Sequence, residues 1–261
     1  MIKCELLALF YNKRKLFVIG MFIAIICFDA YLVYRNSFLY EYNLHPVYDL
    51  KMVYENTYTP SSAAFLSGAS KGHIPQQIII WLLPLYFLFI SSDFHLREVK
   101  YNNYQLLQIR EKTNKIYICK LISSFLIGFC VAFIGVLINY IICLIVFRNG
   151  LVQKISADGL TFLSSNNPRL TYVFYMIIFS CISGLVSSSM TALCFVVPLK
   201  IPVYTASFGV WYFMISGKYS ITYLIQPFIE YGLSYMIPSF LMFMCVVIII
   251  MMIGYLKIKR L

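Results

Sequence analysis

The chain has 261 residues, of which 61% are hydrophobic and only 12% charged, and its formal net charge is +11. About a quarter of the residues of a soluble globular protein are charged, so this composition, with its long apolar runs, places the chain in a lipid bilayer and leaves no room for a soluble catalytic domain of ordinary size. The basic residues lie at the ends of apolar stretches rather than in one aromatic-rich patch, which indicates lipid headgroups and excludes a nucleic-acid partner.

Residues 1–15 predict a short amphipathic helix that lies in the membrane interface. Ile2, Leu6, Leu9 and Phe10 have the spacing that places them on one helical face. The alternative is a frayed cytoplasmic tail. A cleavable signal peptide is not expected, because the apolar run that follows is long enough to span and no small-residue cleavage site closes it.

Six apolar stretches predict membrane-spanning helices, since a lone strand would leave its backbone groups unpaired in lipid. The predicted spans cover residues 16–34, 76–92, 116–147, 172–197, 203–216 and 237–256. The fifth is short for a span, and the third is longer than a bilayer requires. Residues 35–75 are expected to form an external loop. Residues 217–236 mix polar and aromatic side chains, which favours a re-entrant or interfacial piece before the last span.

The distribution of Lys and Arg predicts the orientation of these spans. Fourteen of the 21 basic residues fall in the N-terminal segment, residues 93–120, the link after the fourth span and the C-terminal end, whereas seven fall in the alternate loops. The positive-inside rule therefore predicts that both termini are cytoplasmic, which agrees with an even number of spans. The expected fold class is an all-α membrane protein.

Residues 93–115 are the best candidate for contact with a soluble partner. Leu96, Val99 and Leu106 fall within about one helical face, but Lys100 and Arg110 interrupt it. Two interpretations stay open, a helix that meets both the membrane and a protein surface, and an ordinary basic cytoplasmic loop.

Motifs for catalysis and metal binding are weak. Residues 68–72 match G-x-S-x-G with Ser70 as the nucleophile, but the segment has no strand signals, and the nearby His73 does not make a triad by adjacency alone. A flexible Gly/Ser loop is therefore favoured. A phosphate-binding loop ending at Lys218 fails at its first Gly and its Ser/Thr position. The three histidines fall on different sides, so neither a metal site nor a catalytic residue is expected.

Three polar residues lie inside or beside apolar stretches. Asp29 is costly in a span and should face protein or water, either as a residue of a translocation path or as a hydrated group near the outer headgroups. Glu230 poses the same alternatives, with a wetted loop favoured. Asn139 predicts an interhelical hydrogen bond. The small residues of 180–189 predict close helix packing within the bundle, with a dimer face as the alternative.

The layout resembles the transmembrane subunit of a bacterial ABC-2-type ABC transporter. The family has an interfacial N-terminal helix, six spans and a basic cytoplasmic helix between spans two and three. The stretch QIREKTNKIYICKLISSFLIGF at residues 108–129 is similar to its opening of span three, on Arg110, Thr113, Tyr117 and Lys120. The external loop at 35–75 is longer than in the smallest members, which leaves the substrate open.

This resemblance implies a permease half that works as a homodimer or heterodimer in the bacterial cell membrane. Two copies of a separate ATP-binding subunit would hold ATP and Mg, and this chain would bind no cofactor. It would export a peptide, a bacteriocin or lantibiotic, or an amphipathic drug. Residues 93–115 would be the coupling helix, with contacts from Arg97, Glu98, Lys100, Tyr104, Arg110, Glu111 and Lys112. The alternatives are a membrane-embedded serine hydrolase that uses Ser70 and a scaffold subunit without transport of its own.

Overall fold

The computed structural model describes residues 2–44, 50–67, 73–100, 109, 111–153, 167–228 and 231–259. Within these ranges the chain is helical and has no β-strand, apart from one isolated bridge between Tyr58 and Val152. The helical elements are α1 (Ile2–Tyr11), α2 (Lys13–Tyr34), η1 (Arg35–Leu39), α3 (Tyr40–Leu44), α4 (Leu50–Glu55), α5 (Pro60–Ala63), η2 (Phe65–Ser67), α6 (Ile74–Phe87), η3 (Leu88–Ser92), α7 (Asp93–Lys100), α9 (Thr113–Val146), α11 (Pro168–Val196), α12 (Lys200–Ser216), α13 (Thr222–Ile225) and α14 (Leu233–Ile258).

The long helices are apolar enough to cross a bilayer. In the part of the chain that the structure describes, five candidate spans meet the length and hydropathy requirement, namely Lys13–Leu44, Ile74–Ser92, Thr113–Val146, Pro168–Val196 and Leu233–Ile258. α12 has 17 residues, which is slightly short of a full crossing. The chain is therefore an all-α, multi-pass membrane protein.

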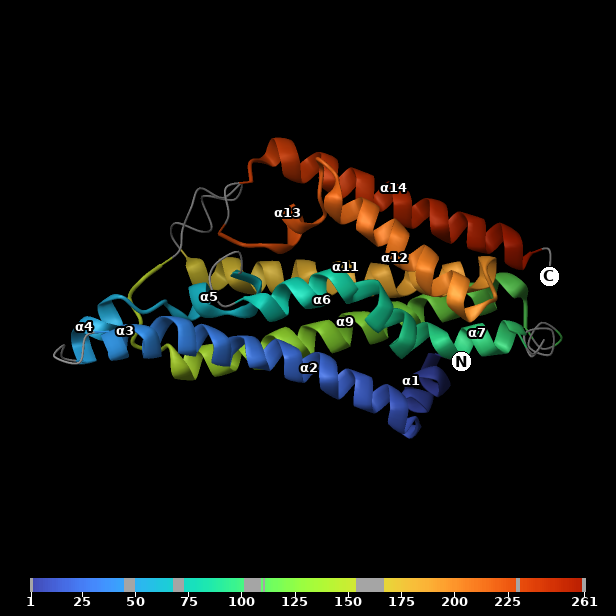
Figure 1. The fold of residues 1–261 in the computed structure, drawn as a ribbon. Coiled ribbons are helices and arrows are strands. Elements are labelled where there is room, and N and C mark those ends of the chain that lie inside the picture. The colour runs from blue at the N-terminus through green and yellow to red at the C-terminus, as the bar shows by residue number, and fades with distance from the viewer. Residues whose placement is uncertain are drawn as a thin grey trace.

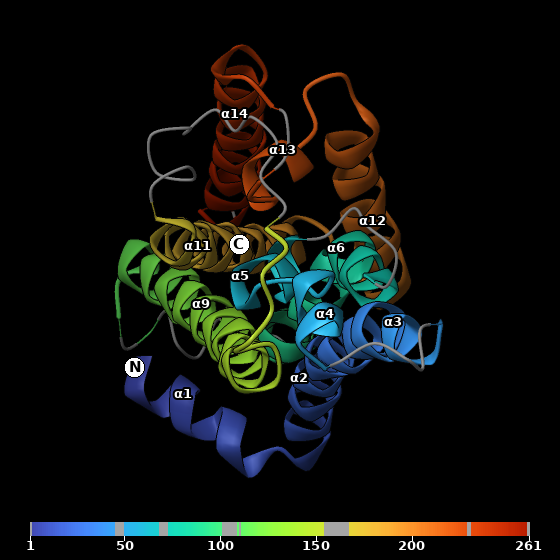
Figure 2. The same cartoon turned by 90° about the vertical axis from the view of Figure 1, so that its left-hand side faces the viewer.

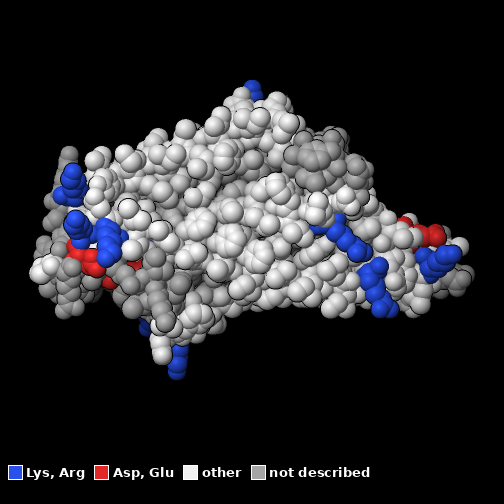
Figure 3. Space-filling model, turned by 180° about the vertical axis from the view of Figure 1, so that it is seen from behind, with Lys and Arg blue, Asp and Glu red and all other residues white. Residues whose placement is uncertain are grey.

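The bundle has two distinct ends (Figure 1). Both chain termini and α7 lie at one end, which we call the α7 end, whereas α3 and α4 lie at the other, which we call the α3 end. On the face shown in Figure 3, where the α7 end is on the left, most of the visible Lys and Arg lie towards the two ends, with a basic side chain at the upper edge, and a broad uncharged surface separates the two groups. This distribution suits a protein whose middle is surrounded by lipid.

α1 is separated from α2 by a capped break. Asn12 is the N-cap of α2, and its side-chain Oδ1 accepts hydrogen bonds from the backbone N–H groups of Arg14 and Lys15 at 3.1 and 3.4 Å. α1 lies across the direction of α2 (Figure 2). The segment expected as one interfacial helix over residues 1–15 thus divides here, because the cap starts a new helix at Lys13.

The segment expected as an external loop over residues 35–75 contains much regular structure. The helix that starts at Lys13 continues past Tyr34 through η1 and α3 to Leu44. Tyr34 and Phe38 stack with ring centroids 5.2 Å apart, and aromatic pairs at this spacing support a helix beyond the apolar core. Further on, every residue of segment 60–67, which contains α5 and η2, is buried, so this segment lies inside the bundle.

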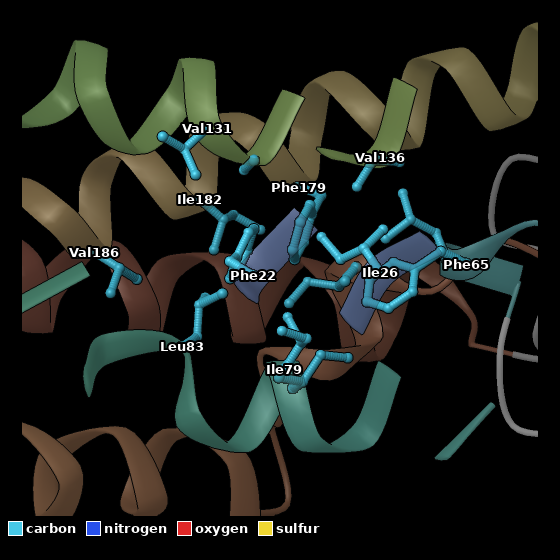
Figure 4. Close-up of a cluster of buried hydrophobic side chains, with 14 of the residues drawn as sticks. Phe22, Ile26, Phe65, Ile79, Leu83, Val131, Val136, Phe179, Ile182 and Val186 are labelled. Atoms are coloured by element: carbon cyan, nitrogen blue, oxygen red, sulfur yellow. The ribbon is translucent and has the colours of Figure 1, made fainter. Parts of the chain in front are cut away.

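The core shows how deeply that piece enters. Phe65 of η2 lies beside Ile26 of α2 and Val136 of α9, close to Phe179 of α11 (Figure 4). The rings of Phe65 and Phe179 are 6.4 Å apart and meet at 63°, and both side chains are fully buried. Burial of a Phe side chain stabilises a fold by about 1.5–3 kcal/mol, so Phe65 anchors the segment.

α11 is the central helix and packs against α9, α14 and α6 (Figure 2). α12 is held to α6 by the indole of Trp211, whose Nε1 donates to the backbone oxygen of Ile80 at 2.7 Å. The segment expected to be re-entrant or interfacial over residues 217–236 contains the short α13, which packs on α11 and α14. Ile225 of α13 and Ile221 just before it are fully buried.

Candidate functional site

A buried polar cluster joins three helices at the α7 end. We call it the Lys120 cluster, and it consists of Glu5 of α1, His95 and Glu98 of α7, and Lys120 and Ser123 of α9. The ammonium of Lys120 is fully buried, and it donates to Glu98 Oε2 and to His95 Nδ1, the latter at 3.0 Å. Its Nζ also lies 3.4 Å from Glu5 Oε1, and Ser123 Oγ donates to Glu5 Oε2. A single cation therefore ties α1, α7 and α9 together.

The protonation of His95 follows from its neighbours. Its Nδ1 lies 3.0 Å from Lys120 Nζ and 3.3 Å from Glu98 Oε2. An ammonium can only donate, so Nδ1 accepts and the proton of the neutral ring sits on Nε2. Burial and the charge of Lys120 hold the pKa of His95 below its usual value, against the opposing effect of the two glutamates. The ring is therefore neutral at pH 7.

Glu98 is the anion of the same cluster. Burial raises the pKa of its carboxyl, but the charge of Lys120 and the hydrogen bond from its ammonium favour the carboxylate, and the pKa lies below its usual value. With two carboxylates and one ammonium, the cluster depends on Lys120 for charge compensation. Glu98 was expected to contact a separate subunit, and in this structure its carboxylate binds Lys120 inside the chain.

Of the other residues expected in the coupling segment, the side chains of only some lie within the described part of the chain. Arg97 and Lys100 belong to α7, but their side chains, together with Tyr104 and Arg110, lie outside the described part of the chain. Glu111 and Lys112 are exposed at the start of α9. Glu111 pairs with Lys115 one turn later at 2.9 Å, in a solvent-exposed i,i+4 pair of the kind that stabilises a helix end weakly.

Two of the positions that resemble the family's opening of span three, Tyr117 and Lys120, face the interior of the bundle. The hydroxyl of Tyr117 donates to the backbone oxygen of Met251 in α14 at 2.6 Å, and its ring contacts Phe195 of α11 with centroids 5.7 Å apart. Tyr117 and Lys120 thus fix the first turns of α9 to its neighbours. The start of α9 is held on both sides, by α14 through Tyr117 and by α1 and α7 through Lys120.

A second buried polar site lies towards the α3 end of α2. Asp29 is fully buried, and its Oδ2 lies 2.7 Å from Nδ1 of His73, which is 2% exposed. Asp29 therefore has a partner inside the protein in His73. His73 Nε2 has no hydrogen-bond partner among the described residues.

The side chains of three residues, Asn139, Gln76 and Tyr172, hold the neighbouring segment 60–67 in place. The amide of Asn139 donates to the backbone oxygen of Ile26 at 2.7 Å and accepts from the backbone N–H of Phe65 at 3.0 Å. Gln76 Nε2 donates to the backbone oxygen of Leu66 at 3.0 Å. The backbone N–H of Leu66 donates to the hydroxyl of Tyr172 at 3.4 Å. The interhelical hydrogen bond predicted for Asn139 is present, and it serves an internal segment as well as a helix.

Several expected features lie outside the described residues. They are Glu230, Ser70 and the rest of the G-x-S-x-G motif. The described residues contain no group of three or more His, Cys, Asp or Glu that could hold a metal ion.

The small-residue face of α11 packs inside the bundle. Ser187 donates to Ser91 of η3 at 2.9 Å, and Thr191 donates to Ser124 of α9 at 2.7 Å. A Cβ added to Gly128 would lie 2.6 Å from the Cβ of Ser187, so α9 and α11 approach as closely as backbones allow. The seam uses its small residues within one chain.

Sequence reasoning did not find the connection of Glu5 and His95 to Lys120, nor the pairing of His73 with Asp29. The partners are 115, 25 and 44 residues apart. The one available signal was chemical, because a Lys and an Asp within apolar runs each require a partner.

The comparisons with known proteins give one relative. No protein-family model and no solved structure matches the chain. The "Uncharacterized protein YybM" of Bacillus subtilis (strain 168) is 30% identical over 233 residues, which cover 87% of this chain and 86% of the relative. The chain therefore belongs to the same protein family as YybM of Bacillus subtilis.

Proposed function

We propose that the chain is the membrane-spanning subunit of an ATP-driven exporter of the ABC-2 type. In this proposal α12 completes six crossings, and the α7 end faces the cytoplasm of a bacterial cell. The position of both termini at one end of the bundle supports an even number of crossings (Figure 1). The two-to-one excess of Lys and Arg on the proposed inner side supports the orientation.

The observation that carries the proposal is the attachment of α7 to α1 and α9 through Lys120. α7 is a polar helix at the end of a span, and Glu98 links it to a cation that is fully buried in α9. A partner that displaced α7 would therefore move α9 with it, since separating Glu98 from Lys120 would leave the Glu98 carboxylate without its counterion. This is the mechanical connection that a coupling helix needs.

The energy source and the partners follow from the same proposal. The sequence contains no phosphate-binding loop, so ATP and Mg would be held by two copies of a separate ATP-binding subunit. The exposed residues Glu111 and Lys112 beside the buried cluster would be available for that contact. A second permease subunit, identical or different, would complete the path. The cargo would be an amphipathic peptide, bacteriocin, lantibiotic or drug.

Co-purification tests the proposal directly. The tagged chain, expressed from its own chromosomal locus, is extracted in mild detergent, and the co-purifying proteins are identified by mass spectrometry. We expect a protein with ATPase motifs, and ATP hydrolysis by the purified complex. Recovery of the chain in folded form with no ATP-binding partner would refute the exporter proposal.

Charge reversal then tests the contact surface. Arg110→Glu with Lys112→Glu should release the ATP-binding subunit while the chain stays folded and inserted. Lys218→Glu, an exposed Lys after α12, is the matched control and should retain it. If the double variant retains the ATPase as well as the control does, residues 93–115 are not the coupling segment.

A second candidate function, a membrane-embedded serine hydrolase, is favoured by the Asp29–His73 pair. The carboxylate holds Nδ1 of the ring at 2.7 Å and Nε2 has no partner in the described residues, which is the arrangement of the acid and base of a catalytic triad. Ser70 would supply the nucleophile. Labelling with a fluorophosphonate should then occur in the wild type and vanish in Ser70→Ala and His73→Gln, but persist in Ser234→Ala. A wild-type chain that takes no label would exclude this function.

A further inference from the structure

A groove with aromatic walls opens at the α3 end between α2 and α9. Its volume is about 450 Å³, within the range of ligand sites. Tyr31 and Tyr34 of α2, Phe38 of η1 and Tyr54 of α4 supply four aromatic rings to its lining. The rings of Phe38 and Tyr54 are 5.4 Å apart, so α4 closes the groove at its outer limit.

The groove crosses the boundary between hydrocarbon and headgroups. Counting from Lys15 at 1.5 Å per residue, Cys27 lies about 18 Å and Tyr34 about 29 Å along α2. The hydrocarbon core is about 30 Å thick, so Tyr34 lies at its far boundary and Cys27 about 10 Å inside it. The inner end is lined by Cys27, Ala30 and Ile142, none of which carries a charge. An occupant must therefore be apolar at one end.

Two arginines follow groove-lining residues in the chain. Arg35 comes directly after Tyr34, and Arg148 lies in the turn two residues after Val146 of α9. The rings of Tyr34 and Phe147 are 6.3 Å apart, which brings these two parts of the chain to the same level. Arg35 also comes one turn after Tyr31, which places it on the groove side of the helix. Both side chains are exposed, and neither has an ion pair with a described carboxylate. The occupant should be anionic at this end.

We propose that the groove binds one anionic phospholipid of the leaflet at the α3 end. Its phosphate lies between Arg35 and Arg148, and one acyl chain follows the rings of Tyr31 and Tyr34 inward to Cys27. Apolar contact with the aromatic rings holds the chain, and the two guanidinium groups distinguish a negatively charged headgroup from a zwitterionic one. The inference depends on membrane insertion alone and is independent of the exporter proposal.

Native mass spectrometry of the detergent-solubilised full chain tests the site. Phosphatidylglycerol and phosphatidylcholine with identical acyl chains are titrated separately. A basic residue near anionic lipid contributes about fivefold in affinity, so two arginines predict roughly a thirty-fold preference for phosphatidylglycerol at a single site. Glycerol 3-phosphate, which lacks the chains, should not displace the lipid. No preference, or a preference for phosphatidylcholine through choline held by the aromatic rings, would overturn the proposal.

Variants separate the two parts of the site. Arg35→Gln with Arg148→Gln should abolish the preference for phosphatidylglycerol, whereas Arg169→Gln, an exposed arginine at the start of α11, should leave it intact. Cys27→Trp fills the inner end and should weaken binding of both lipids alike. Thermal melting of each variant confirms folding. Unchanged phosphatidylglycerol binding in the double variant, or an equal loss in Arg169→Gln, would show that the arginines do not hold the headgroup.

Discussion

Replacing Lys120 by Met should destabilise the protein strongly at pH 8. The substitution keeps an unbranched side chain of similar length but removes the ammonium that contacts both Glu5 and Glu98. Loss of one partner of a buried ion pair costs about 3–5 kcal/mol, because the remaining charge stays buried without compensation. For a chain of this size, 1 kcal/mol shifts the melting temperature by roughly 2–4 °C, so a fall of about 6–20 °C is expected.

The pH dependence should reverse in this variant. In the wild type the pKa of His95 lies below its usual value of 6.5, so the unfolded chain binds more protons and stability falls as the pH drops below about 6.5. Glu98, also with a lowered pKa, adds a further loss below its usual value of 4.5. Without Lys120 the two carboxylates raise the pKa of His95, and its imidazolium takes over the role of the ammonium. Lowering the pH from 8 to 6 should therefore stabilise Lys120→Met while it destabilises the wild type.

Thermal unfolding in detergent at pH 8, 7 and 6 measures both effects. Lys115→Met is the matched control, because Lys115 lies on the same helix in an exposed pair with Glu111. The control should melt with the wild type at every pH, since surface pairs contribute little. If Lys120→Met melts with the control at pH 8, or if its melting temperature falls in parallel with the wild type towards pH 6, the charge balance assigned to the cluster is incorrect.

Two further substitutions address the middle and the α3 end of the bundle. Asn139→Leu removes the side-chain amide that bonds to the carbonyl of Ile26 and the N–H of Phe65. The free energy of unfolding, measured by urea titration, should fall by about 2–5 kcal/mol. An unchanged urea midpoint would show that water replaces the amide. Gly128→Val places a Cβ within 2.6 Å of Ser187 and 2.8 Å of the backbone oxygen of Ser183. It should therefore lower the melting temperature far more than the control Gly20→Val, whose site has no neighbour within 4 Å. Equal melting temperatures of the two variants would contradict the close approach of α9 and α11.

The long helices were predictable because length and hydropathy are local properties. Residues 168–196 form one apolar helix, as the stretch predicted over 172–197 requires. Segment 60–67 was not predictable by the same means. It has the Ser and Pro content of a loop and is too short for a span, and its burial depends on side chains such as Asn139 and Gln76 that arrive from other helices.

For the polar sites, likewise, the sequence pointed to a residue that needs a partner but not to the partner itself. Asp29 could be singled out by the cost of a carboxylate in a span, but the sequence offered no rule that joined it to His73, which belongs to the end of an expected loop. Lys120 was counted as one of the basic residues that set the orientation. Its burial became evident only when α1 and α7 brought Glu5 and Glu98 to it, because no fixed spacing relates residues on three different helices.

α9 connects the Lys120 cluster to Asn139, which holds segment 60–67. Lys120 and Asn139 lie 19 residues apart on this unbroken helix, a distance of about 29 Å. Between them Gly128 and Gly184 set α9 and α11 against each other so closely that one helix cannot slide without the other. A force applied to α7 would thus pass through Lys120 to the α9–α11 pair as a unit. At the far end that pair holds the buried segment 60–67 through hydrogen bonds from Phe65 to Asn139 of α9 and from Leu66 to Tyr172 of α11, so a shift of the pair would alter these contacts.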